Sequence, residues 1–234
     1  MIRILTIIFF AAFALPVAAQ HPLEGTWEMV SISGINVDGE KFYLDSTTVK
    51  ETKIITSSHY ILIAMDKVGD GWVFNRCYAG TVRMKGQKYY EMPVISSLRI
   101  FENVKTDFSW KMDGDRFIQS GTITRPDGKQ IILHEFVFAR SRQPSAGVAA
   151  AIKGTWKLEQ PDTHTGLFIA NATHWMMITR TQDKLSRASG GPIVEHQSKP
   201  HALVAYSSEA NAGLLPLQVD KKKLSLDGLL FEKK

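Results

Sequence analysis

Leu23-Glu24-Gly25-Thr26-Trp27-Glu28-Met29 returns later in the chain as Ile152-Lys153-Gly154-Thr155-Trp156-Lys157-Leu158. In both copies Gly-Thr-Trp follows an aliphatic residue by two positions and precedes a strand-like run. A pattern that recurs within one chain indicates repeated structural units. The sequence therefore predicts two homologous β-units, each beginning at its own Gly-Thr-Trp.

Two further segments recur in the same order. Residues 53–60 (KIITSSHY) align without gaps with residues 168–175 (FIANATHW), and residues 110–117 (WKMDGDRF) align with residues 217–224 (LQVDKKKL). The second unit is shorter and shows no separate final strand after Phe231. We therefore expect it to be a reduced barrel, or a half-barrel that needs the first unit to cover its edge.

The first unit shows strand-like alternation separated by turn signals. Asp-Gly pairs within 37–40, 112–115 and 126–128 are typical of hairpins, and residues 60–65 alternate between two faces. No stretch has a sustained helical period. Many short strands at even spacing predict an all-β fold, here two antiparallel β-barrel units of which the second is reduced.

The first nineteen residues have the pattern of a secretory signal. Arg3 precedes an apolar run that ends in small residues, and cleavage is expected before Gln20. We expect an exported protein, periplasmic or extracellular. The expected boundaries are 1–19 for the signal peptide, 20–140 for the first barrel, 141–149 for a small polar linker and 150–234 for the second unit.

The amino-acid composition limits the possible cellular compartments and binding partners of the protein. Cys77 is the one cysteine, so an internal disulfide is excluded, and a bacterial periplasm or exterior suits such a chain better than a eukaryotic secretory route. The net charge of +5 comes from scattered basic residues, which argues against nucleic acid as a partner. No segment after the signal is apolar enough for stable membrane insertion. The sequence does not determine the oligomeric state.

The ordered motifs of the first unit resemble those of a known family. Gly-x-Trp at the start of an all-β domain resembles the opening motif of lipocalins and the wider calycin group. Thr56 to Tyr60, a Gly-Asp-aromatic hairpin and a last strand that ends in Arg140 resemble the lipocalin-like domains of exported bacterial proteins. The resemblance covers nearly all of the first unit and, more thinly, the second.

The resemblance implies structural roles for the motif residues. In that family the motif tryptophan fills the closed end of the barrel and an arginine of the last strand packs across its ring, which implies this role for Trp27 and Arg140. Trp156 would fill the second unit. No arginine partner for Trp156 is apparent, because the residues after Phe231 are Glu232-Lys233-Lys234.

A small antiparallel barrel can be filled by side chains or can hold one small ligand. Strand alternation would turn His134 inward together with Phe136 and Phe138, and the set is mostly aromatic with a few polar groups, as small-molecule pockets are. The expected ligand, small and hydrophobic or amphipathic, would contact Tyr60, Tyr89, Glu91, Trp110, Gln119, His134 and Phe136.

Other candidate chemistry is weak in the sequence. His196 and His201 lie in a glycine- and proline-containing stretch that reads as a surface loop, and their spacing matches no strong zinc pattern. His59 and His174 occupy equivalent repeat positions, which indicates a shared structural role at a strand start. Cys77 lies in an apparent strand and is expected to be a buried, inert thiol. We expect no cofactor and no metal.

Three hypotheses for function follow. The first is a non-catalytic binding protein that holds a small, partly apolar ligand in the first barrel. The second is a barrel enzyme, an isomerase or a hydrolase, that uses His134 with a carboxylate such as Glu91 or with a tyrosine. The third is a structural or interaction module with filled barrels.

Overall fold

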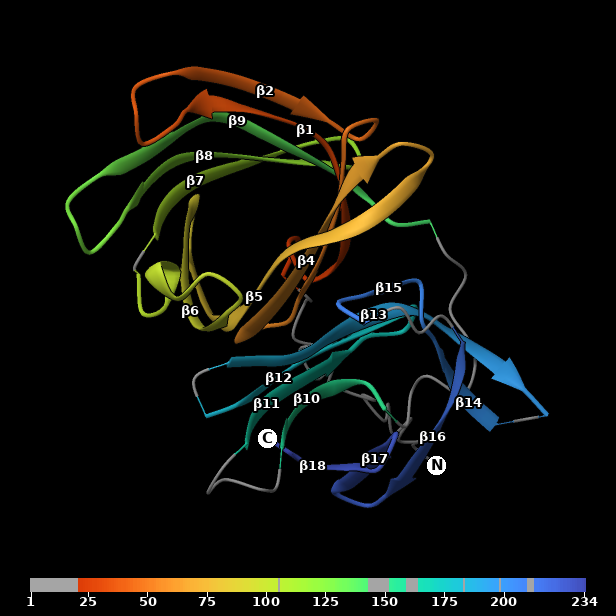
Figure 1. The fold of residues 1–234 in the computed structure, drawn as a ribbon. Coiled ribbons are helices and arrows are strands. Elements are labelled where there is room, and N and C mark those ends of the chain that lie inside the picture. Colours follow the sequence, from red (N-terminus) through yellow and green to blue (C-terminus); the bar gives the residue numbers. More distant parts are fainter. Residues whose placement is uncertain are drawn as a thin grey trace, which may run out of the picture.

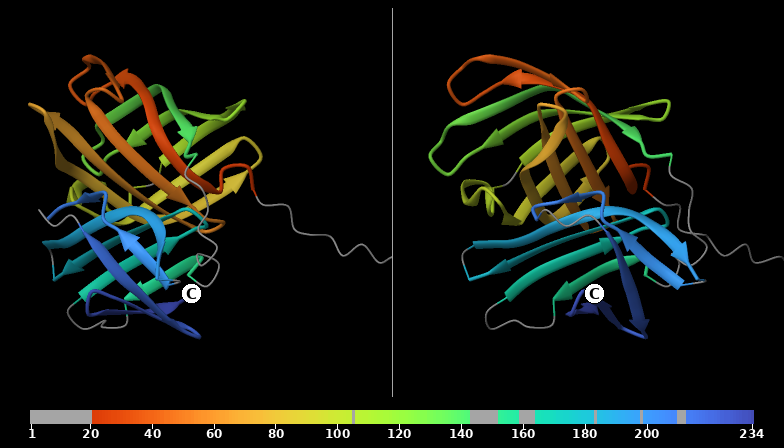
Figure 2. Two further views of the ribbon diagram at one scale, coloured as in Figure 1. Left: turned by 90° about the vertical axis from the view of Figure 1, so that its right-hand side faces the viewer. Right: turned by 45° about the vertical axis from the view of Figure 1, so that its right-hand side comes forward.

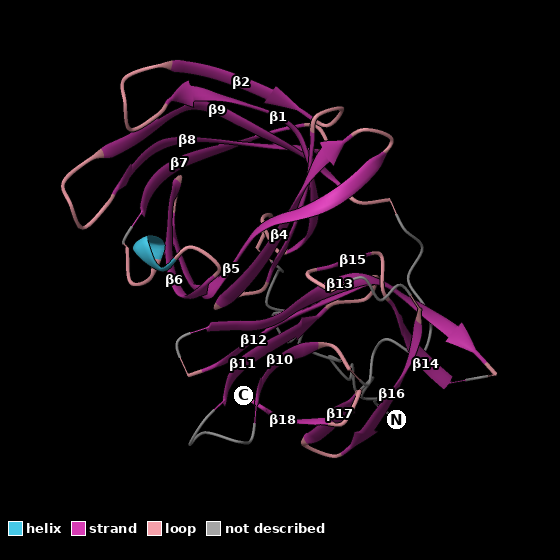
Figure 3. Ribbon diagram, in the orientation of Figure 1, coloured by secondary structure: helices cyan, strands magenta, loops and turns pink. Residues whose placement is uncertain are grey.

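The computed structural model describes residues 21–104, 106–142, 152–158, 164–182, 184–197, 199–209 and 213–234. In these ranges the chain forms two closed antiparallel β-barrels of eight strands each (Figure 1). Figure 3 shows that strands dominate both barrels, and the described part of the chain has one short helix, η1 (Arg99–Phe101). The predicted all-β class is confirmed. The predicted signal and residues 143–149 of the predicted linker lie outside the described residues.

The first barrel consists of β1 and β3 to β9, and pairing of β1 with β9 closes it. β2 is an addition, because β1 pairs with β3 through its first half and with β2 through its second half. The strands are β1 (Gly25–Ile35), β2 (Lys41–Asp45), β3 (Val49–Ile55), β4 (His59–Val68), β5 (Gly71–Lys85), β6 (Lys88–Ser96), β7 (Thr106–Asp113), β8 (Arg116–Thr124) and β9 (Gln130–Arg140).

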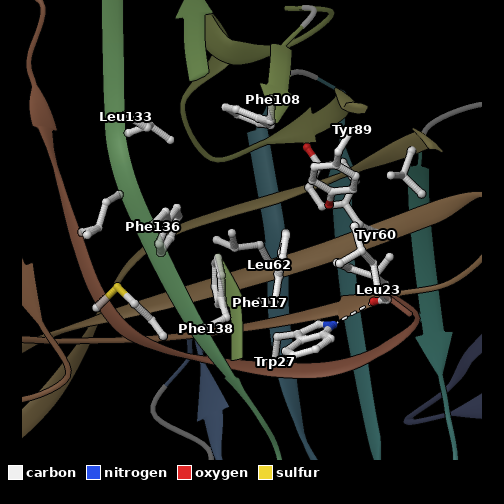
Figure 4. Packing of buried hydrophobic residues seen from close by; sticks show 14 of the residues in the cluster. Leu23, Trp27, Tyr60, Leu62, Tyr89, Phe108, Phe117, Leu133, Phe136 and Phe138 are labelled. Atoms are coloured by element: carbon white, nitrogen blue, oxygen red, sulfur yellow. Dashed lines mark hydrogen bonds between the residues drawn. The ribbon is translucent and has the colours of Figure 1, made fainter. Parts of the chain in front are cut away.

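The closed end of the first barrel is built around Trp27. The indole is buried, its Nε1 donates to the Leu23 carbonyl at 2.7 Å, and its ring lies 5.5 Å from that of Phe117 (Figure 4). The Arg140 guanidinium lies 4.3 Å from the centre of the Trp27 ring. Arg140 also donates to the carbonyls of Glu24 (3.0 Å) and Pro22 (2.7 Å), so it ties the chain before β1 to the end of β9.

The second barrel consists of β10 to β14 and β16 to β18, with β15 as a short addition. Its strands are β10 (Gly154–Leu158), β11 (His164–Ala170), β12 (His174–Thr181), β13 (Lys184–His196), β14 (Lys199–Leu203), β15 (Tyr206–Ser207), β16 (Leu214–Asp220), β17 (Lys223–Leu226) and β18 (Leu229–Lys233). Trp156 repeats the role of Trp27, since its Nε1 donates to the Ile152 carbonyl at 2.9 Å. Lys233 replaces the arginine, with Nζ 5.2 Å from the Trp156 ring centre.

The expectation that the second unit lacks a closing strand is wrong. β18 pairs with both β17 and β10 and so closes the barrel. The turn between β17 and β18 is Asp227-Gly228, and both residues have positive φ (50° and 75°). Asp-Gly is the sequence signal for this kind of two-residue hairpin. The second barrel is therefore complete, although its strands are mostly shorter.

The glycine- and proline-containing stretch around His196 and His201, for which the sequence predicts a surface loop, is also β-strand. Gly190, Gly191 and His196 belong to β13, and His201 belongs to β14. Glycine is needed where strands approach closely: a Cβ on Gly191 would lie 2.1 Å from the Leu203 carbonyl oxygen. The loop prediction therefore failed because these glycines serve packing within the sheet, not a turn.

The two barrels pack through equivalent faces (Figure 2). On β4, residues 60, 62 and 64 face the lumen, whereas Ile61, Ile63 and Met65 face the second barrel. The shared apolar layer comes from β3 to β6 on one side and β11 to β13 on the other: Ile54, Ile61, Ile63, Met65, Cys77, Ala79 and Ile95 meet Leu167, Ile169, Met176, Ile178 and Ala188. β4 is apolar on both faces because both faces are buried.

Candidate functional site

The lumen of the first barrel contains a cavity of about 340 Å³. Trp27 does not belong to its lining, and the Trp27 ring packs instead against Phe117, whose ring stacks on that of Phe138 (Figure 4). The lining is mainly apolar with a few polar groups: Ile32, Phe42, Leu44, Glu51, Lys53, Tyr60, Leu62, Asn75, Arg76, Tyr78, Glu91, Pro93, Leu98, Phe101, Val104, Thr106, Phe108, Gln119, Ile123, Ile131, Leu133 and Phe136.

The polar centre of this cavity is an ion pair between Lys53 of β3 and Glu91 of β6. Lys53 is 1% exposed, and its Nζ lies 2.8 Å from Oε1 of Glu91. The Tyr89 hydroxyl donates a hydrogen bond to the same carboxylate oxygen. Thr106 accepts from the Glu91 amide at 2.9 Å and donates to its carbonyl at 3.1 Å, which fixes β6 against β7 at this point.

Aromatic rings surround the Lys53 ammonium. Its Nζ lies 5.0 Å from the ring centre of Phe138 and 5.8 Å from each of the ring centres of Tyr60, Tyr89 and Phe136. Cation–π attraction and the Glu91 carboxylate together compensate the loss of water around the charge. Burial, together with the negative charge of Glu91, raises the pKa of Tyr60 and of Tyr89 well above 10, so both hydroxyls stay neutral.

A second ion pair lies in the same lining. Arg76 of β5 donates to Oε2 of Glu51 on β3 at 2.8 Å. Burial raises the pKa of Glu51, although the charges of Arg76 and Lys53 act in the opposite direction. Within the described part of the chain, Oε1 of Glu51 and Oε1 of Gln119 have no hydrogen-bond partner.

The second barrel serves as an internal comparison for this site. The aligned segments and the strand registers match Lys53 to Phe168, Glu91 to Ala202 and Gln119 to Leu226. The three residues of the second barrel are apolar and fully buried in its core. The barrel therefore folds without polar groups at these positions, and the ion pair of the first barrel is not required by the architecture.

Most of the residues predicted to contact a ligand come together here. Tyr60, Glu91, Gln119 and Phe136 line the cavity, whereas Tyr89 lies behind the lining and donates a hydrogen bond to Glu91. Trp110 does not belong to the lining. Its Nε1 donates to the Gly86 carbonyl at 3.0 Å and its ring packs 5.4 Å from His21, near the closed end.

The expectation that His134 faces the lumen is wrong. His134 is exposed, because β9 carries a β-bulge between Leu133 and Phe136, seen as register shifts against both β1 and β8. The extra residue turns Leu133 and Phe136 inward and leaves His134 and Glu135 outside. Gly34 faces the bulge, and a Cβ there would lie 2.1 Å from the Ile132 carbonyl oxygen. His134 therefore does not line the cavity with Glu91, the carboxylate that the enzyme hypothesis names as one possible partner.

His59 and His174 have the shared structural role that their repeat positions predict. Nδ1 of His59 bonds to the Ser58 hydroxyl at 2.8 Å, and Nδ1 of His174 bonds to the Thr173 hydroxyl at 2.9 Å. Burial is the main cause that lowers the pKa of both imidazoles, that of His59 to about 4. Nε2 of His59 lies 3.3 Å from Nζ of Lys234, a contact between the two barrels.

Cys77 is buried, as predicted, and it lies in the apolar layer between the barrels. Burial raises the pKa of its thiol to about 12. His196 and His201 stack edge to face across the β13–β14 hairpin, with ring centres 5.3 Å apart. In the described part of the chain, no three His, Cys, Asp or Glu side chains are grouped so as to hold a metal ion.

Sequence reasoning missed Lys53, Glu51 and Arg76. A signal for Lys53 was present, because the gapless alignment of residues 53–60 with 168–175 places it opposite Phe168. The first unit has a lysine at this position and the second unit has an aromatic residue. This difference indicates that the two units surround the position with different chemistry. Glu51 lies two residues away on the same strand face, so the alternation of β3 brings both charges into the lumen.

Comparison with known proteins gives a likeness of fold. No family model and no curated protein matches the chain. Among solved structures, the uncharacterized protein YLR301w from Saccharomyces cerevisiae is similar, with a TM-score of 0.53 and 11% sequence identity over 89% of this chain and 97% of that one. At this identity the likeness concerns the fold alone. None of the helices in the described residues has the length and apolar character to cross a membrane.

Proposed function

We propose that this chain is a lipocalin-like protein that holds a small, partly apolar molecule in its first barrel and does not change it chemically. The observation that carries this proposal is the difference between the two lumens. Lys53, Glu91 and Gln119 line a cavity where the second barrel has Phe168, Ala202 and Leu226. A buried ion pair is a poor source of stability, so its presence in one copy alone favours a role in binding.

In this proposal the second barrel supports the first. Its core is filled by large side chains, among them Trp156, Phe168, Trp175 and Phe231. Its outer face covers one wall of the first barrel through the shared apolar layer. It would hold β3 to β6, which carry Lys53 and Glu91, in a constant geometry. Export to the periplasm or the exterior is proposed on the pattern of residues 1–19 alone.

Native mass spectrometry of the protein purified from its own host tests the proposal. A bound small molecule should appear as a mass above that of the chain and should leave on activation in the gas phase. A matched pair of variants locates it. Leu133→Trp fills the cavity, whereas Leu203→Trp adds the same side chain to the exterior of the second barrel.

We expect Leu133→Trp to lose the bound molecule and Leu203→Trp to keep it. Thermal melting of both variants establishes that they fold. If the wild-type protein carries no adduct and its melting temperature is unchanged by a panel of lipids and metabolites, the binding proposal fails.

A further inference from the structure

Two oxygens in the lining of the first-barrel cavity have no hydrogen-bond partner within the described ranges. They are Oε1 of Glu51 and Oε1 of Gln119, on side chains that are 3% and 1% exposed. Leaving a buried acceptor without a donor is costly, so these oxygens favour any ligand that brings a donor. The other oxygen of Glu51 accepts from Arg76, and Glu91 accepts from Lys53 and Tyr89.

The charged side chains of the lining balance one another. Lys53 faces Glu91 and Arg76 faces Glu51, each at 2.8 Å, and among the described residues these four are the charged ones that line the cavity. A ligand carboxylate would lose its hydration beside two carboxylates, and a ligand ammonium would lose its hydration beside two cations. The lining therefore favours a ligand that has no net charge.

Resting on the proposed function, we infer that the ligand is an uncharged apolar molecule with at least one hydroxyl group, which donates a hydrogen bond to Oε1 of Gln119. A hydroxyl suits this lining because it both donates and accepts. If the Gln119 carboxamide is rotated by about 180°, its NH2 group takes the place of its oxygen, and a hydroxyl can then accept a hydrogen bond instead of donating one. A second hydroxyl, where the ligand has one, would reach Glu51. The pKa of Glu51 is raised by burial, but a hydroxyl can donate to the ionised carboxylate and can accept from the protonated acid, so it suits both forms.

A set of linear probes of similar length separates the contributions. 1-Decanol, decyl methyl ether and decylamine share a decyl chain, decanoate has a nine-carbon alkyl chain, and the four differ in the head group. Each is added to the full chain at pH 8 in competition with Nile red, a neutral fluorescent probe of apolar cavities. We expect 1-decanol to bind about tenfold more tightly than the ether, since it alone supplies a neutral donor, and the two charged probes to bind more weakly than the alcohol.

Gln119→Leu tests the residue. The second barrel carries Leu226 at this position, so leucine suits the local packing. The variant should lose the advantage of the alcohol over the ether and keep its affinity for the ether. Gln218→Leu, an exposed site on β16, is the matched control and should change neither affinity.

The outcomes distinguish this inference from the proposed function. If the ether or decanoate binds as tightly as the alcohol, the hydroxyl inference is overturned while binding in the lumen stands. If the alcohol keeps its advantage in Gln119→Leu, the assignment to Gln119 is overturned. If neither Nile red nor any probe binds the wild-type protein, the proposed function itself fails.

Discussion

At the scale of single residues, the two lumens differ by a few side chains that change their chemistry. Lys53 and Glu91 place two charges inside the first barrel, at positions where the second barrel has Phe168 and Ala202. The surrounding rings and the Tyr89 hydroxyl compensate part of the loss of hydration. Each charge is therefore tolerated only because of its partner, which can be tested directly.

Lys53→Met should lower the free energy of unfolding by about 3 kcal/mol, because it leaves the Glu91 carboxylate buried and unpaired. The double variant Lys53→Met/Glu91→Leu should recover most of that loss, since it removes both charges. Urea unfolding of the wild type, both single variants and the double variant measures the coupling. Additive losses would contradict an interacting pair.

The two motif tryptophans allow a matched comparison of arginine with lysine. Arg140→Met should cost about 2 kcal/mol of unfolding free energy, because it removes the stacking on Trp27 and two hydrogen bonds to carbonyls. Lys233→Met should cost less than about 0.5 kcal/mol, since Lys233 is exposed and lies farther from its indole. Equal losses in the two variants would argue against the anchoring role of Arg140.

At the scale of elements, β4 and β9 show where a sequence pattern is sufficient and where it is not. Strict alternation from Tyr60 to Met65 predicts two opposite faces, and both are found buried. In β9 the same reasoning places His134 inward, and one bulge reverses that result. A bulge depends on tertiary pairing with β1 and β8, so alternation within β9 does not reveal it.

A pair of substitutions in β9 tests the bulge. Phe136→Ala should cost about 3–5 kcal/mol of unfolding free energy, because it opens a cavity in the lumen wall. His134→Ala should change stability by less than about 0.5 kcal/mol and leave binding of apolar probes unaltered, because the imidazole is on the outside. A strong effect of His134→Ala on probe binding would contradict the outward placement of this side chain.

The closing strand and the cavity show further limits of sequence reasoning. Asp227-Gly228 was a readable turn signal, so β18 could have been predicted from the sequence. The ion pair of Lys53 with Glu91 could not, because it joins β3 to β6, strands that are not neighbours in the sheet. Alignment of the repeats identifies Lys53 as unusual, whereas its partner emerges only from the closed barrel.

At the scale of the whole molecule, contacts between the barrels link stability to pH. The pKa of His59 is lowered from 6.5 to about 4 by burial and by the charges of Lys234 and Lys157. The unfolded chain therefore takes up this proton near pH 6.5, and the folded protein only near pH 4. The contribution of neutral His59 is complete above pH 6.5 and is lost as the pH falls toward 4.

We expect the wild-type protein to lose on the order of 1 kcal/mol more than His59→Asn between pH 7 and pH 4, after allowance for screening by solvent around this half-buried group. Thermal melting across this range measures the difference between the two proteins. His196→Asn, an exposed histidine on β13, is the control and should follow the wild type. Parallel curves for His59→Asn and the wild type would contradict the linkage.

The position of Cys77 allows the rate at which the two barrels separate to be measured by modification of its thiol. This thiol is the only cysteine of the chain and lies sealed between the two barrels. A neutral disulfide reagent can reach it only when that seal opens, so the time course of modification should follow the opening and not the reagent concentration once reagent is in excess. An Ile178→Ala variant, which loosens the same layer, should react faster. The lifetime of the closed two-barrel state can thus be measured at the native thiol of Cys77, without an engineered cysteine.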